Sequence, residues 1–554
     1  MLSSQDSSME KGDRLHDLPA PQTEPGTTEA QEDGVTTPRE RKHYSFHLTI
    51  LMLALIGLIV AWDATALSLA LPIIAEQLEG TNFQSFWSNI AFILAIAVTQ
   101  PIYASISDVV GRKHVLYTSI LFFAIGSIVF ATAPNMDTVI AGRLIKGLGG
   151  GGLDVLQTII LCDITTLKER PRWLGVMAVA NAVGAVSGPL IGGAFAERVG
   201  WPWLGWINLI IVAITAVLTF FFLHLTPLEG DMKGKMRKLD WSGFSIFTVA
   251  CTAVALPLSW VSTLYDWASW QTLVPLLVGL SLLVPFGFVE KKAKVPMIPY
   301  HIFDNVTIII GTGAAFLYGA ILNPLLFYLP LFFQAVYLET PIEAAMSTLP
   351  LCCVLVGSSI AMSILIDRTR KYRIAVWTGW SLTTIFLGLT YTVGANTSRA
   401  QAYAFQAILG AGIGTAQVAT MISALASVTK VDNEGLAAGM LVTARFIGSL
   451  LGLAVCSTIF SSSFSKGLPS LEHLPEQFLL LEDAGQAVGF IPRLREIEAS
   501  DVVTRAYEDA FQTIWIVLAA FSGFAALLTV LTKENSLEKS DVGRQGFQAP
   551  SSAK

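Results

Sequence analysis

Four charged residues in the first half of the chain lie inside long apolar stretches, where charged side chains are rare. They are Asp63 in the first stretch and Arg143, Lys146 and Asp154 in a later one. An ionisable group in the hydrocarbon core of a bilayer costs roughly 2.5–3.5 kcal/mol on insertion scales and usually faces a polar cavity or a partner. A carboxyl group shielded from water can exchange protons near neutral pH, and an arginine, which stays charged, can promote release of the proton. These residues therefore predict proton exchange, or recognition of a cationic solute, within a membrane.

Structural roles for the same residues stay open. Asp63 and Arg143 can form an ion pair that only holds two helices together. Lys146 can extend its ammonium group toward the membrane surface or bind an anionic solute. Asp154 can pair with Lys146 or face an aqueous cavity on the cytoplasmic side.

A second set of polar residues lies in other apolar stretches, and we expect it to line a substrate cavity. Its members are Asn181, Asn323, Gln406, Gln417 and Arg445. Arg445 is the cation of the set, and we expect it to contact the substrate or a carboxylate from the first half of the chain.

A short charged segment occurs twice, about 260 residues apart, each time between two apolar stretches. The first copy contains Asp108, Gly111, Arg112 and Lys113, and the second contains Asp367 and Arg368. We expect Asp108 to cap the next segment while Arg112 and Lys113 meet the C-terminal carbonyls of helices. Such a network can form in one conformation and break in another, which makes it a candidate gate. A charge cluster that only orients the chain in the membrane is the alternative.

Glycine recurs at every fourth position in one stretch, at Gly184, Gly188 and Gly192, beside Pro189 and Gly193. Small residues at this spacing let two helices approach closely, and proline removes a backbone hydrogen bond. We expect a close, water-excluding contact between the two halves of the molecule. Ordinary helix packing is the alternative.

The elements that position these residues are membrane helices. Apolar residues make up 53% of the 554-residue chain and charged residues only 14%, against about 25% charged in soluble domains. A bilayer core of about 30 Å needs about 20 apolar residues per helix. Fourteen stretches qualify: 48–71, 87–107, 115–133, 139–162, 173–196, 203–225, 241–262, 270–290, 306–332, 344–366, 374–394, 401–427, 436–460 and 511–532. The sequence predicts an all-α polytopic membrane protein.

The loops between these stretches predict the orientation. Alternate short loops carry about 17 lysines and arginines, whereas the others carry Arg198 and Arg399. The positive-inside rule then places both termini in the cytoplasm. The duplicated charged segment divides the chain into two six-helix halves separated by two inserted helices, a 6 + 2 + 6 arrangement. In such proteins the substrate site lies between the halves, near the midplane.

The predicted domain limits follow from this division. They are a disordered cytoplasmic tail (1–44), a first half (45–226), two inserted helices with linkers (227–305), a second half (306–532) with an outer loop at 461–510, and a second tail (533–554). The tails are rich in polar residues and poor in aromatic ones.

Several function classes are excluded by what the sequence lacks. It contains no G-x-x-x-x-G-K-[ST] phosphate loop, no clustered His and Cys, and no basic patch interleaved with aromatic residues. We therefore expect no metal, no cofactor, no nucleic acid and no enzymatic activity, and a gradient as the energy source. Asn396 begins a glycosylation sequon on the outer side, in a very short loop.

Several of these segments together resemble the major facilitator superfamily, in particular its fungal fourteen-helix drug:proton antiporter branch, over about residues 45–535. The resemblance rests on residues 62–72 around Asp63, residues 107–113, the Arg143-x-x-x-Gly-x-Gly pattern, and residues 184–193. Residues 184–193 match the helix motif associated with antiporters at its glycine and proline positions.

This resemblance implies a monomeric antiporter of the plasma membrane that exports a toxin, drug or secondary metabolite in exchange for protons as its two halves rock. The small-molecule substrate, protons and the lipid bilayer are its expected partners. A siderophore-type uptake symporter and a non-transporting membrane sensor are the alternatives.

Overall fold

The described part of the chain is helical throughout. The computed structural model describes residues 44–538 except 81, 227, 229–233, 235–236, 238, 262–264, 294–295, 297–301, 304, 431–432, 468–489, 492–493 and 495–500. Within these limits the helices are α1 (Tyr44–Gln77), α2 (Asn82–Val110), α3 (Arg112–Ala131), α4 (Met136–Ile164), α5 (Arg170–Arg198), α6 (Trp203–Phe222), α8 (Trp241–Trp260), α9 (Trp270–Lys292), α10 (Val306–Val336), α11 (Pro341–Ser347), α12 (Leu349–Thr369), α13 (Arg373–Thr390), α14 (Arg399–Ala426), α15 (Glu434–Gly467) and α17 (Asp501–Val530). The all-α prediction is confirmed.

Each of the fourteen predicted spans falls on a long helix. By length and apolar composition, 12 segments of the described chain could cross a membrane. Helices α5 and α13 lie outside this set.

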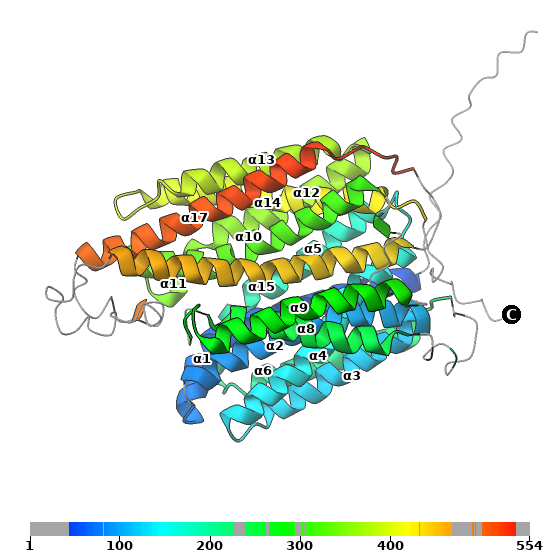
Figure 1. Cartoon of the computed structure of the whole chain (residues 1–554), viewed down its shortest axis with the longest axis horizontal. Helices are drawn as coiled ribbons and strands as arrows, with labels where there is room; N and C mark the ends of the chain where they lie inside the picture. The colour runs from blue at the N-terminus through cyan, green and yellow to red at the C-terminus, as the bar shows by residue number, and fades with distance from the viewer. Residues whose placement is uncertain are drawn as a thin grey trace, which may run out of the picture. The chain divides into compact units, whose positions relative to one another are not determined.

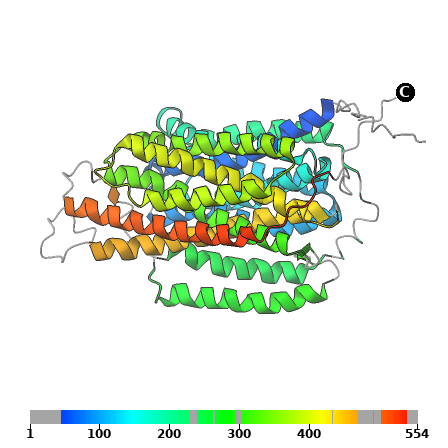
Figure 2. The ribbon, with the colours of Figure 1, turned by 90° about the horizontal axis from the view of Figure 1, so that it is seen from above.

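The long helices run side by side (Figure 1). Along the first half, α5 packs on α1, and α4 packs between α2 and α3; along the second, α10 packs on α15, and α14 packs between α12 and α13. Helices α8 and α9 pack on each other at one side of the other helices (Figure 2). The two halves meet where α15 lies against α4 and α2 and where α12 lies against α5.

The glycine run in α4 explains how this helix fits between its two neighbours. A Cβ atom at Gly147 would overlap the Phe92 carbonyl of α2, and one at Gly149 would overlap the Phe123 backbone of α3. Because these positions carry no side chain, both neighbours approach the α4 backbone directly. The run therefore packs helices together and fixes the position of the polar residues earlier in α4.

The glycine stripe of α5 packs against a different helix from the one predicted. Cβ atoms at Gly184, Gly188 and Gly192 would meet Leu58, Thr65 and Ala66, all on α1. The expectation of a contact between the halves is therefore wrong, since the stripe packs two helices of the same half. α5 continues as a helix through Pro189 and Gly193.

Two predicted boundaries also change. Helix α2 continues to Val110, so Asp108 lies within its last turn and does not cap the next helix. Helices α15 and α17 extend into the predicted outer loop 461–510, which is therefore shorter than expected. Apart from residues 490, 491 and 494, the rest of that loop lies outside the described residues, as do the tails before residue 44 and after 538.

Candidate functional site

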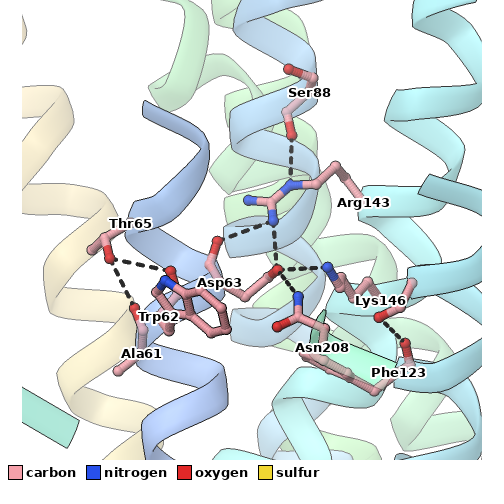
Figure 3. A network of polar contacts seen from close by, with 10 residues as sticks. Ala61, Trp62, Asp63, Thr65, Ser88, Phe123, Arg143, Lys146 and Asn208 are labelled. Atoms are coloured by element: carbon pink, nitrogen blue, oxygen red, sulfur yellow. Dashed lines mark hydrogen bonds and ion pairs between the residues drawn. The ribbon is translucent and has the colours of Figure 1, made fainter. Parts of the chain in front are cut away.

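Asp63 is the centre of a polar cluster that joins α1, α4 and α6 of the first half, and Arg143 also bonds to the Ser88 carbonyl of α2 (Figure 3). Arg143 of α4 donates from Nη1 to Asp63 Oδ2 at 2.6 Å and to the Asp63 carbonyl at 3.1 Å. Lys146, one turn further along α4, donates from Nζ to Oδ1 at 2.6 Å. Asn208 of α6 donates from Nδ2 to the same oxygen at 2.6 Å. One carboxylate thus receives donors from two other helices.

The cluster is enclosed by protein. Asp63 is 5% exposed, while Arg143 and Lys146 are each 1% exposed. Arg143 lies over the Phe92 ring at 4.3 Å, and Lys146 lies near the Phe130 ring at 5.1 Å. Aromatic faces stabilise cations that are withheld from water. The site can therefore hold charged groups inside an apolar bundle.

This cluster holds more positive than negative charge, and more hydrogen-bond donors than acceptors. Two basic side chains face one carboxylate, and the Nη2 atom of Arg143 is buried with no acceptor among the described residues. Both oxygens of Asp63 accept hydrogen bonds from these donors, which favour the ionised carboxylate. Loss of one of these contacts would favour the protonated form.

A second polar cluster lies where the two halves meet. Gln100 of α2 donates to Asp154 Oδ2 at 2.8 Å, and Arg445 of α15 approaches the same oxygen with Nη2 at 3.7 Å. Of the two contacts expected for Arg445, with the substrate or with a carboxylate of the first half, the structure shows the second. The suggested pairing of Asp154 with Lys146 is wrong, since Lys146 is bound to Asp63.

The predicted cavity residues are divided among several places. Gln417 and Arg445 line one cavity in the second half. Asn323 instead donates to Ser449 at 2.6 Å, which ties α10 to α15. Gln406 is 3% exposed, and neither its amide nitrogen nor its oxygen has a partner among the described residues. Asn181 lies beside Gly57 in the first half.

Arg112 is the centre of the first charged segment. It donates to Asp163 at 2.9 Å, to Asp108 at 3.0 Å and to Ser107 at 2.7 Å. Two carboxylates are therefore its ion-pair partners, which the sequence did not predict. Lys113 meets a helix C-terminal carbonyl as predicted, donating to the Leu223 carbonyl beyond the end of α6 at 2.8 Å. Gly111 has a φ of 114°, which suits the break between α2 and α3.

The second charged segment makes different contacts from the first. Asp367 pairs with Arg370 at 3.3 Å, whereas Arg368 is exposed. Arg370 also donates to the Lys168 carbonyl in the first half. The second copy therefore joins the two halves through Arg370, a residue outside the predicted set.

The halves are also joined beside the first charged segment. Arg170 at the start of α5 pairs with Glu434 at the start of α15 at 2.7 Å, and both are buried. A Cβ atom on Gly435 would lie 2.7 Å from Asp163 Oδ1 and 3.3 Å from Arg112 Nη2. The first turn of α15 therefore rests directly on the Arg112–Asp163 pair and closes this end of the interface.

Several of these residues were absent from the sequence prediction. They are Asn208, Gln100, Asp163, Arg170 and Glu434. Asn208 and Gln100 carried a usable signal, since each is a polar residue in an apolar stretch. Asp163, Arg170 and Glu434 lie at predicted helix ends, where charged residues are common and their burial cannot be inferred.

Two further predictions concern sites of other kinds. In the part of the chain that the structure describes, no group of three or more His, Cys, Asp or Glu side chains is placed to hold a metal ion. Asn396 is exposed in the turn between α13 and α14, and its glycosylation stays a prediction.

Comparisons with known proteins agree with this architecture. Residues 53–453 match the family model described as Major Facilitator Superfamily. The chain is 39% identical to the MFS-type transporter sphD of Aspergillus fumigatus, over 95% of this chain and 91% of that protein. It is 30% identical to the efflux pump FUS6 of Gibberella moniliformis, over 90% and 89% of the two chains.

Solved structures show the same fold at low sequence identity. The proton:xylose symporter XylE has a TM-score of 0.56 and 12% identity, covering 90% of this chain and 98% of that one.

Proposed function

Because this chain belongs to the major facilitator superfamily, we propose that it is a secondary transporter that exports small organic molecules in exchange for protons. Its relatives are named as efflux pumps and as a transporter of a biosynthetic cluster, which supports a toxin, drug or secondary metabolite as the substrate. The observation that carries proton coupling is the buried Asp63 with its three donors. We infer fourteen membrane crossings, cytoplasmic termini, a monomer and a plasma-membrane location.

Proton exchange at Asp63 is linked to helix packing by the geometry of the cluster. Arg143 and Lys146 come from α4, and Asn208 comes from α6, whereas Asp63 is on α1. A neutral carboxyl group accepts weaker hydrogen bonds than a carboxylate and loses its ion pairs with both cations. Uptake of the proton therefore weakens the contact of α1 with α4 and α6, and its release restores that contact.

The interface between the halves supports alternating access. Its charge-rich end is closed by the Arg170–Glu434 pair and by Gly435 resting on Arg112 and Asp163. The basic loops make this end cytoplasmic under the positive-inside rule. The conformation is then one that is closed toward the cytoplasm, with Asp108, Gly111, Arg112, Lys113 and Asp367 in the gate region.

The test is compound accumulation in cells with and without the gene, repeated with a protonophore and with Asp63→Asn. Export predicts more intracellular compound in cells that lack the gene, and loss of the pH-gradient response in the variant. Reduced uptake in cells that lack the gene would indicate the import alternative. Unchanged accumulation for every compound would overturn transport and favour the sensor.

A further inference from the structure

A cavity in the second half has apolar walls and a cationic end. It lies among α10, α14 and α15, and its lining includes Tyr318, Gln417, Met421, Leu441, Val442 and Arg445. Arg445 points across the interface toward Asp154 of the first half. The cationic end of the cavity is therefore directed toward the interface between the halves.

The guanidinium group of Arg445 retains donors that no group among the described residues accepts. Its Nη2 atom is 3.7 Å from Asp154 Oδ2, which is longer than a hydrogen bond. That oxygen already accepts from Gln100 at 2.8 Å. In the described part of the chain no acceptor lies within hydrogen-bond distance of the Arg445 guanidinium, and its side chain is 29% exposed.

Tyr318 supplies a second donor to the same cavity. This residue is 5% exposed, and its hydroxyl has no partner among the described residues. A buried hydroxyl without a partner is unfavourable by itself and is satisfied when a ligand supplies an acceptor.

The charged residue in the lining of the cavity is a cation, Arg445, and no acidic residue among those described lines it. The nearest carboxylate, Asp154, is 3.7 Å from the guanidinium and already accepts a hydrogen bond from Gln100. In a low-dielectric bundle the arginine therefore favours an anionic ligand group over a cationic one.

We propose that this cavity binds the acidic group of an apolar organic acid, with the carboxylate on Arg445 and Tyr318 and the apolar body against Met421, Leu441 and Val442. This inference rests on the proposed transport function and names its substrate class. A carboxylate fits the guanidinium because the planar fork of arginine can donate two parallel hydrogen bonds to it.

The test measures binding of three probes with the same aromatic body to the purified full-length protein: 2-naphthoate, 2-naphthamide and 2-naphthylmethylammonium. We expect 2-naphthoate to bind at least about tenfold more tightly than the other two, since hydrogen bonds to charged groups are the stronger kind. Arg445→Gln should remove most of this preference. Tyr318→Phe, which keeps the ring and deletes only the hydroxyl, should weaken the binding of 2-naphthoate by a few-fold. Arg198→Gln, at an exposed arginine, is the matched control.

Equal binding of the acid and the amide would overturn the proposal, as would tightest binding of the ammonium probe or an unchanged preference in Arg445→Gln. Because binding is measured without a gradient, it can fail or succeed independently of transport. If compounds are exported but 2-naphthoate shows no preference, the substrate class is wrong and the transport function stands. If 2-naphthoate binds as expected but no compound is moved, the cavity assignment stands and the transport function fails.

Discussion

Replacing Asp63 with asparagine removes the one negative charge from a cluster with two buried cations. The substitution keeps the size of the side chain but turns one acceptor into an amide donor, which faces donors from Arg143 or from Lys146 and Asn208. Removing one partner of a buried ion pair costs about 3–5 kcal/mol, because the remaining charge stays buried without compensation. We expect Asp63→Asn to lower the free energy of unfolding by an amount in this range and to abolish the response of transport to a pH gradient.

A double variant separates loss of charge balance from loss of packing. Lys146→Met removes one cation and leaves Asp63 paired with Arg143 alone. If charge balance dominates, Asp63→Asn with Lys146→Met should be more stable than Asp63→Asn alone, so the two effects will not add. Thermal unfolding followed through the 13 tryptophans would measure both variants, with exposed Asp266→Asn as the control.

Two results would refute this reasoning. One is an Asp63→Asn protein with unchanged melting temperature and an intact response to the pH gradient. The other is strict additivity in the double variant, which would mean that the excess positive charge does not determine the cost.

Three further predictions concern packing and gating. Gly188→Ala should cost about 1–3 kcal/mol, because the added methyl overlaps Thr65, whereas Gly357→Ala, which has open space around it, should leave the melting temperature nearly unchanged. Gly435→Val should separate the two halves at the charge-rich end of their interface, and so raise the rate at which a maleimide alkylates buried Cys162. Gly357→Val is the control for this variant. Equal alkylation rates in the two variants would contradict the gate assignment. Lys113→Gln should lower the free energy of unfolding by about 0.3–1 kcal/mol, because it loses a cation at the C-terminus of α6; a change well above this range would indicate a larger role for Lys113.

The charged segments show where prediction from the sequence succeeds and where it stops. A contact of Lys113 with helix C-terminal carbonyls could be predicted, because a cation is favourable at such an end. The sequence did not show that the helix is α6, whose Leu223 carbonyl is 110 residues away in the chain. The partner of Arg112 could not be predicted from the sequence. Asp163 is 51 residues away in the chain, and only the packing of α3 on α4 brings the two side chains to 2.9 Å.

The glycine stripe of α5 could likewise be predicted only in part. Spacing by four residues correctly indicates a close helix contact, since it places small residues on one face. It does not say which helix fills that face. The structure places α1 there, with Thr65 and Ala66 next to the glycines, and the expected contact between the halves is made by other residues.

The sequence alone determined the helical membrane architecture and the presence of ionisable groups within it, because both follow from composition and local spacing. Only the tertiary structure decided that Asp63 and Asn208, 145 positions apart, share a hydrogen bond, and that Arg445 faces Asp154 across the two halves. Ion pairs and hydrogen bonds depend on distances of a few ångströms between side chains. Those distances are set by how the helices pack, which the order of residues along any single helix does not reveal.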